Sequence, residues 1–115
     1  MPHLTLEYSN NVLENDFSSL FLQIHELLST QLPTQLKSCK SRVIGSEDYV
    51  IGDGNKTNAF VHLSILVLKG RSVQLKSAIA TTLMGKLKEH FSGSANQLDL
   101  QISIAINDLP EVYQK

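Results

Sequence analysis

The start of the chain carries a candidate base. An initiator methionine is normally removed before a residue as small as proline, so we expect the mature chain to begin with the secondary amine of Pro2. Burial or neighbouring cations disfavour the charged form of an amine and lower its pKa toward neutrality. A general base is most efficient in that range. Many chains begin with Met-Pro, but here a strand pattern follows at once, which would fix the amine beside a sheet.

Only two of the ten basic side chains are arginines, Arg42 and Arg71. A guanidinium holds a carboxylate or phosphate with two parallel hydrogen bonds, which lysine cannot do. Arg71 lies between a strand pattern and a helix pattern, where the free N–H groups of the helix also attract anions, although a solvated turn arginine is the alternative. Lys40 and Arg42 share one face of another expected strand, as an anion site or as a solvated basic edge.

The remaining residues that often carry chemistry are interpreted as structural. His3 and His62 lack a second ligand at metal spacing, so we expect structural or subunit-contact histidines and no metal. Cys39 has no evident base partner and is typical of a small core residue. Gly52-Asp53-Gly54 is too short for a phosphate loop, and no helix pattern follows it. The residues thus offer an amine base and anion-binding cations.

A weak internal repeat organises the elements that must position these residues. His3-Leu4-Thr5-Leu6 resembles His62-Leu63-Ser64-Ile65, and several apolar pairs share the same offset of 59 residues. Apolar matches alone are common, so the shared offset is the informative part. It divides the chain into halves at about 2–45 and 59–107.

The first half has the pattern strand, helix, strand. Alternating apolar residues over 2–8 predict a half-buried strand. Helical spacing over 16–31 predicts a helix that Asn15 or Asp16 caps. A short strand is expected at 39–44.

The second half repeats that order. A nearly continuous apolar strand is expected at 59–68, followed by a helix that Ser72 caps and that ends at Ser92-Gly93. The alternation over 98–107 predicts the last strand. Between the halves, 49–55 indicates a small extra hairpin or loop.

Two right-handed strand–helix–strand units side by side predict an α+β fold. We expect a single domain over 1–115, with one four- to five-stranded sheet and both helices on one face. The opposite face is expected to carry apolar residues such as Leu66 and Leu68, along with His62. Such a face would otherwise be exposed, so we expect an oligomer.

Length and composition exclude several classes of protein. The 115 residues and 12.8 kDa suit one domain, and 42% apolar with 18% charged residues is typical of a globular chain. A net charge of −1 argues against a nucleic-acid module, which needs a basic face. No apolar run approaches the roughly 20 residues of a membrane span, and the start is not typical of a signal peptide. The single cysteine favours a cytoplasmic location.

Together these residues resemble the tautomerase superfamily, and within it the 5-carboxymethyl-2-hydroxymuconate isomerases. The resemblance covers essentially the whole chain, and the order and spacing of its short motifs make it fairly specific. The motifs are Pro2-His3, Ser41-Arg42-Val43, Asp53-Gly54, Ala59-Phe60-Val61-His62, Gly70-Arg71-Ser72 and His90-Phe91.

The resemblance implies a small homotrimer that uses no cofactor and moves a proton along a conjugated 2-hydroxy-dienoate carrying several carboxylates. Pro2 would be the base, and Arg71 would bind the anion and stabilise developing charge. Lys40 or Arg42 would assist. An apolar wall including Phe60 and residues from a neighbouring subunit would lower the pKa of the amine. The family carries arginine at the position of Lys40, so this chain keeps the charge there but loses the two-pronged geometry.

Two other functions stay open at this point. One is a non-catalytic oligomeric relative that keeps the fold with an unused proline. The other is a different reaction of the same superfamily, decarboxylation or dehalogenation of a small unsaturated acid. An absorbance assay for tautomerisation separates the first of these from an enzyme.

Overall fold

One mixed sheet forms the centre of the molecule. The computed structural model describes all residues, 1–115, and its strand order is β2-β1-β3-β4. The elements in chain order are β1 (His3–Ser9), α1 (Ser18–Gln31), the 3-10 turn η1 (Leu36–Ser38), β2 (Lys40–Ser46), β3 (Asn58–Val67), α2 (Val73–His90), α3 (Ser92–Gln97) and β4 (Asp99–Asp108). The β1–β2 and β3–β4 pairs are parallel, and the antiparallel pair β1–β3 joins them at the centre. The expected α+β fold is confirmed, with four strands.

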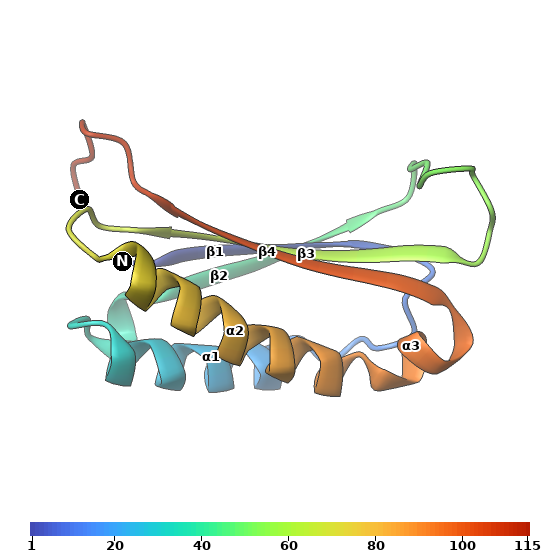
Figure 1. The fold of residues 1–115 in the computed structure, drawn as a ribbon, viewed down its shortest axis with the longest axis horizontal. Helices are drawn as coiled ribbons and strands as arrows, with labels where there is room; N and C mark the ends of the chain where they lie inside the picture. Colours follow the sequence, from blue (N-terminus) through green and yellow to red (C-terminus); the bar gives the residue numbers. More distant parts are fainter.

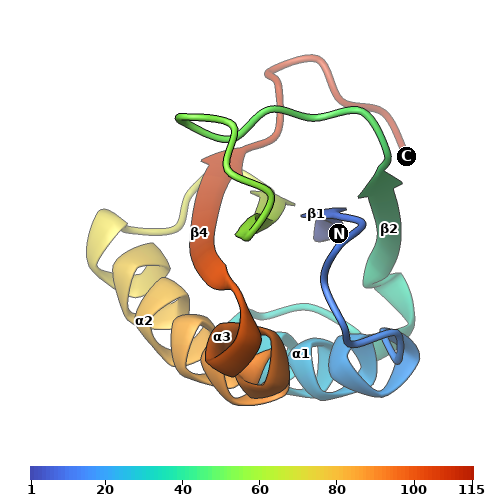
Figure 2. The ribbon, with the colours of Figure 1, turned by 90° about the vertical axis from the view of Figure 1, so that its right-hand side faces the viewer.

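Both long helices cover the same face of the sheet, as Figures 1 and 2 show. The sheet residues that face them alternate along each strand, and Leu4, Leu6 and Leu63 have no exposed surface. The helices contribute buried side chains at four-residue intervals, namely Leu20, Ile24 and Leu28 from α1 and Ile79, Leu83 and Leu87 from α2. This regular core is what the apolar spacing in the sequence predicted. No helix is long and apolar enough to cross a membrane.

The start of α2 has the expected capping residue, whereas the start of α1 does not. Ser72 caps α2, and its hydroxyl oxygen accepts the Leu75 N–H at 3.1 Å. The α1 helix begins two residues later than expected, at Ser18. Its capping position is Phe17, but the Asp16 carboxylate still accepts the Ser19 N–H at 3.3 Å. Both helices therefore gain a side-chain acceptor at their first turn.

The short helix α3 was not predicted from the sequence. The Glu14 carboxylate accepts the backbone N–H of Ser94 at 3.0 Å and also the Ser94 hydroxyl. A Cβ atom at Gly93 would lie 2.7 Å from a Glu14 oxygen, so a larger residue there would displace this carboxylate. An acceptor 80 residues away thus holds the start of this helix, and no local pattern could reveal it.

The segment between β2 and β3 is a loop and contains no extra hairpin. Its turn is closed by the Gly54 N–H, which donates to the Ile51 carbonyl at 2.9 Å. The Asn58 side chain donates to that same carbonyl and to Asp53 Oδ1, each at 2.9 Å. Gly52 and Gly54 have φ angles of 54° and 79°, which favour glycine. These local bonds replace the strand pairing that a hairpin would need.

The sheet face away from the helices is more polar than expected. Strand alternation and register place these side chains on it: His3, Thr5, Glu7, Lys40, Arg42, Ile44, Phe60, His62, Ser64, Leu66, Gln101, Ser103, Ala105 and Asn107. Leu66 is there as expected, 37% exposed, and Ile44 is 51% exposed. The expectation of an apolar face is nevertheless wrong at most positions. The 47–57 segment and the C-terminal tail both rise on this side of the sheet (Figures 1 and 2).

Candidate active site

The N-terminus is held in place at one end of the sheet. Pro2 is buried directly before β1, and its carbonyl accepts the Lys40 N–H at 3.1 Å. The Met1 ammonium donates to the Ser38 carbonyl at 3.0 Å, and the Thr34 hydroxyl donates to the Met1 carbonyl at 2.5 Å. With Met1 present, the Pro2 nitrogen is part of a tertiary amide and is not a base. The bond from the Lys40 N–H to the Pro2 carbonyl does not involve Met1, and it holds Pro2 beside the start of β2.

A cavity of about 310 Å³ lies beside this terminus. Its lining combines residues from the start, the middle and the end of the chain: Met1, Pro33, Thr34, Gln35, Ser38, Leu68, Arg71 and Lys115. Arg71 follows Gly70, whose φ of 110° turns the chain between β3 and α2. One arm of the guanidinium donates to the Leu68 carbonyl at 3.1 Å, while its Nε is buried without a partner. Only this one hydrogen bond to the chain uses the guanidinium, which leaves other donors of Arg71 for an anionic ligand in the cavity.

The electrostatic surroundings favour a neutral amine at this position. Burial is the largest cause that lowers the pKa of the Met1 ammonium, and the positive charges of Lys40, Lys115 and Arg71 lower that pKa further. The Cys39 thiol acts in the opposite direction. Because these cations surround the end of the chain, they would act in the same sense on an amine at Pro2.

The structure brings together most, but not all, of the residues singled out in the sequence. Arg71 lines the cavity together with Met1, the residue directly before Pro2. Lys40 lies close enough to act on the terminal charge, and its N–H bonds to the Pro2 carbonyl. Arg42 points instead to His3, with both terminal nitrogens 3.4 Å from its Nδ1.

Phe60 does not reach this site within one chain. It lies at the start of β3, where its N–H donates to the Ser9 hydroxyl at 2.9 Å. Leu66, which pairs with His3, is six residues further along the strand, roughly 20 Å away. The antiparallel pairing of β1 and β3 places the start of one strand beside the end of the other.

Three residues near the terminus were not singled out as site residues in the sequence. Thr34 and Lys115 line the cavity, and Tyr113 bonds to His3 and to the Met1 sulfur. They lie in irregular segments without periodicity, so only a lone aromatic residue and a lysine in a short polar tail could have drawn attention to them.

The other candidate groups take structural positions. Cys39 is 8% exposed, and burial raises the pKa of its thiol, which suits the expected core residue. His62 Nδ1 lies 2.6 Å from the Ser103 hydroxyl, on the sheet face away from the helices. No group of three or more histidine, cysteine, aspartate or glutamate side chains could hold a metal ion.

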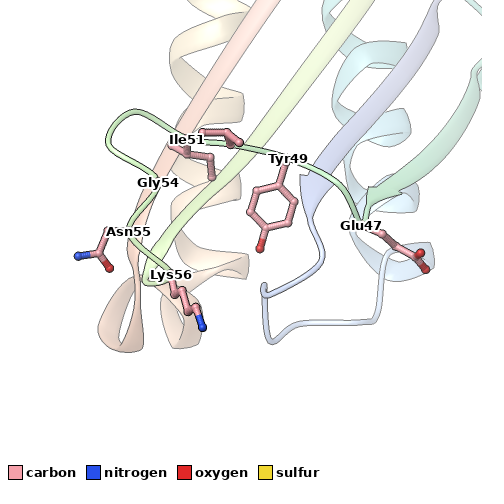
Figure 3. Close-up of a pocket in the computed structure, with 7 residues that line it drawn as sticks. Glu47, Tyr49, Ile51, Gly54, Asn55 and Lys56 are labelled. Carbon is pink, nitrogen blue, oxygen red and sulfur yellow. The ribbon is translucent and has the colours of Figure 1, made fainter.

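A second hollow, of about 350 Å³, lies under the 47–57 loop at the opposite end of the sheet (Figure 3). Glu47, Tyr49, Ile51 and Lys56 are among its lining residues. It contains one carboxylate and one ammonium group and no arginine. The N-terminal cavity instead combines the end of the chain with Arg71 and Lys115, so we take that cavity as the candidate active site.

Comparison with known proteins gives the chain a family. The family described as 5-carboxymethyl-2-hydroxymuconate isomerase matches residues 2–115. The 5-carboxymethyl-2-hydroxymuconate Delta-isomerase of Escherichia coli is 28% identical over 110 residues, covering 95% of this chain and 87% of that protein. A crystal structure of a 5-carboxymethyl-2-hydroxymuconate isomerase from Deinococcus radiodurans R1 matches with a TM-score of 0.89 and 28% identity, over 99% of this chain and 88% of that one.

More distant structures share the fold alone. A fused 4-OT symmetric trimer matches with a TM-score of 0.69 at 15% identity, over 95% of this chain and 86% of that one. The family match spans almost the whole chain, including Pro2 and Arg71. This chain is therefore an isomerase that belongs to the 5-carboxymethyl-2-hydroxymuconate isomerase family.

Proposed function

We propose that the chain isomerises a small 2-hydroxy-dienoate with two or three carboxylates, such as 5-carboxymethyl-2-hydroxymuconate, and that the Pro2 amine is the base. The observation that carries this proposal is the fixed N-terminus beside a cavity lined by Arg71 and Lys115. An amine whose charged form is disfavoured and cations that bind carboxylates are the two components this reaction needs.

The proton transfer requires no group from outside the protein. The neutral Pro2 nitrogen takes the proton of the substrate's 2-hydroxyl or of an allylic carbon, and negative charge spreads over the conjugated system. The resulting prolinium ion returns the proton to a different carbon, and the double bonds shift with it. Atoms and electrons balance within the substrate, so the product is an isomer.

Arg71 is the main partner of the substrate anion in this proposal. Its unpaired Nε and its position directly before α2 place a planar donor and the free N–H groups of a helix start together. The family carries arginine at the position of Lys40, and a lysine there supplies positive charge but cannot make two parallel hydrogen bonds to one carboxylate. The Lys40 Nζ donates to the Ser38 carbonyl at 3.3 Å. We assign Arg42 a supporting role, because it contacts His3 and does not line the cavity.

The assay that tests the function follows ultraviolet absorbance on protein that begins at Pro2. We expect turnover of 5-carboxymethyl-2-hydroxymuconate and 2-hydroxymuconate, with a kcat/KM well above that for phenylpyruvate, which has one carboxylate for the cations to bind. Turnover of phenylpyruvate alone would contradict the proposed substrate class. Absence of turnover for all three compounds would contradict the proposed reaction.

Lys40→Ala is expected to shift the pH dependence of kcat/KM. The Lys40 charge helps to lower the pKa at the terminus, so its removal should raise the pKa of the Pro2 amine. The neutral amine is the active form, and the rising limb of the profile should therefore move to higher pH. Lys40→Arg keeps the charge and is the control, with an expected limb close to that of the wild type. A limb that stays in place in Lys40→Ala would contradict this effect.

We also propose that the chain forms a homotrimer in the cytoplasm. The exposed Ile44 and Leu66 on the sheet face without helices support an assembly, and the free buried Cys39 suits a reducing compartment. In such a trimer Phe60 could contribute to a site only from a neighbouring chain, because it lies far from Pro2 in its own chain.

Sedimentation velocity at micromolar concentration tests the trimer. We expect a species with three times the 12.8 kDa mass of one chain. Ile44→Lys together with Leu66→Lys should weaken the assembly, because charged side chains would replace the apolar ones on this face. The matched control, Leu22→Lys on the solvent side of α1, should leave the mass unchanged, since Leu22 is already 65% exposed there. A monomer of the wild-type chain would refute the proposal.

A further inference from the structure

The chain returns to its own N-terminus after β4. Leu109 is 4% exposed and donates its N–H to the Val67 carbonyl at 2.7 Å, which fixes the start of the tail. The two chain ends then lie at the same end of the sheet, as Figure 1 shows. Tyr113 is half-buried, and its ring lies edge-on to that of His3 with centroids 6.0 Å apart. The tail thus brings a phenol group next to His3 and Met1, at the same end of the sheet as the candidate active site.

A series of hydrogen bonds determines whether the Tyr113 hydroxyl donates to His3 or accepts from it. Both terminal nitrogens of Arg42 lie 3.4 Å from His3 Nδ1, and a guanidinium has only donors, so Nδ1 is the acceptor. Burial, followed by the charges of Arg42, Lys40 and the terminal amine, lowers the pKa of His3, which favours the neutral ring. The ring proton therefore lies on Nε2, which donates to the Tyr113 oxygen at 2.9 Å.

Because His3 is the donor in this bond, the Tyr113 hydroxyl proton is not used by it and can be donated to another acceptor. In this structure it is donated to the sulfur of Met1, which lines the cavity together with Arg71 and Lys115. A thioether is a weak acceptor, whereas an oxygen that carries negative charge is a strong one. Removal of Met1 would take away this acceptor and leave the hydroxyl proton available to another acceptor at the same end of the sheet.

We propose that Tyr113 donates a hydrogen bond to the substrate oxygen on which negative charge develops during proton transfer, and that His3 positions it. This inference rests on the proposed function. The full positive charges of Arg71 and Lys115 suit the carboxylates, which are charged throughout the reaction. A neutral donor suits an oxygen whose charge increases in the transition state. Tyr113 is then a catalytic residue, and His3 is a positioning residue.

The first test compares steady-state kinetics of variants that begin at Pro2. Tyr113→Phe keeps the aromatic ring and removes only the hydroxyl, and we expect kcat to fall about 100-fold with KM nearly unchanged. Tyr8→Phe, at the far end of β1 and packed against Phe17, is the matched control and should keep the wild-type kcat. If wild-type protein is active and Tyr113→Phe is equally active, or is changed only in KM, this inference is overturned while the proposed function stands.

The second test does not depend on turnover. The nitrogen-15 chemical shifts of the His3 ring, measured near neutral pH, report which nitrogen carries the proton. We expect the proton on Nε2 in the wild type, and a changed Nε2 shift in Tyr113→Phe because its acceptor is lost. A proton on Nδ1 would make Tyr113 the donor to His3 Nε2, so its hydroxyl could not donate to the substrate. That result would overturn the inference, whether or not the protein turns over a dienoate.

Discussion

Protein that retains Met1 is expected to lose isomerase activity by about 10²- to 10⁴-fold relative to protein that begins at Pro2, the range of a lost general base. The amide to Met1 delocalises the lone pair of the Pro2 nitrogen, so it cannot accept a proton at any accessible pH. The Met1 side chain also lines the cavity, and its terminal ammonium and its carbonyl are held by Ser38 and Thr34. Retention would therefore remove the base and obstruct the site together.

The comparison needs two samples whose N-termini are verified by mass spectrometry. Treatment of the Met1 sample with a methionine aminopeptidase should restore activity, which separates a blocked base from a damaged protein. Equal activity in both samples would refute the amine as the base. Two inactive samples with an intact fold would refute the proposed reaction.

Arg71→Ala is expected to lower kcat/KM by about 100-fold, equivalent to about 3 kcal/mol of transition-state stabilisation. The substitution removes the donor whose Nε is buried beside the cavity without a partner. Its bond to the Leu68 carbonyl is also lost, so thermal unfolding of the variant should be measured alongside the kinetics.

Two further variants separate the contributions of charge and geometry. Arg71→Lys keeps the positive charge but cannot make two parallel hydrogen bonds to a carboxylate. We expect it to lower kcat/KM less than Arg71→Ala does. Lys40→Ala is also expected to lose less than Arg71→Ala when each is measured at its own pH optimum, because a lone ammonium binds an anion without fixing its orientation. A larger loss in Lys40→Ala would show that the two roles are assigned in reverse.

The fold could be predicted because its core is regular. Alternation in β1 and four-residue spacing in α2 are properties of the local sequence, and the packing of Leu4, Leu6, Ile79 and Leu83 follows from them. The start of α3 depends on the contact between Glu14 and Ser94, which are 80 residues apart, so it could not be read locally. The alternation in β1 and β4 already placed polar residues opposite the core, so the expectation of an apolar open face conflicted with the sequence pattern itself.

The site could be predicted only where it lies at the boundary of an element. Pro2 precedes a strand and Arg71 precedes a helix, so their positions follow from the element pattern. The location of Phe60 depends on β1 and β3 being antiparallel, which local sequence does not reveal. Tyr113 reaches the neighbourhood of the candidate site through a tail without periodicity, and its partner His3 is 110 residues away in the sequence.

The most direct measurement is a titration of the Pro2 nitrogen itself. The chain has three prolines, and in protein lacking Met1 only the nitrogen of Pro2 is an amine, so nitrogen-15 labelled proline gives one titrating signal. We expect its pKa to lie below the usual range of an α-amino group, roughly 7.7–8.0, and to coincide with the rising limb of kcat/KM against pH. A pKa at or above that range, or a limb that follows a different group, would contradict the Pro2 amine as the base.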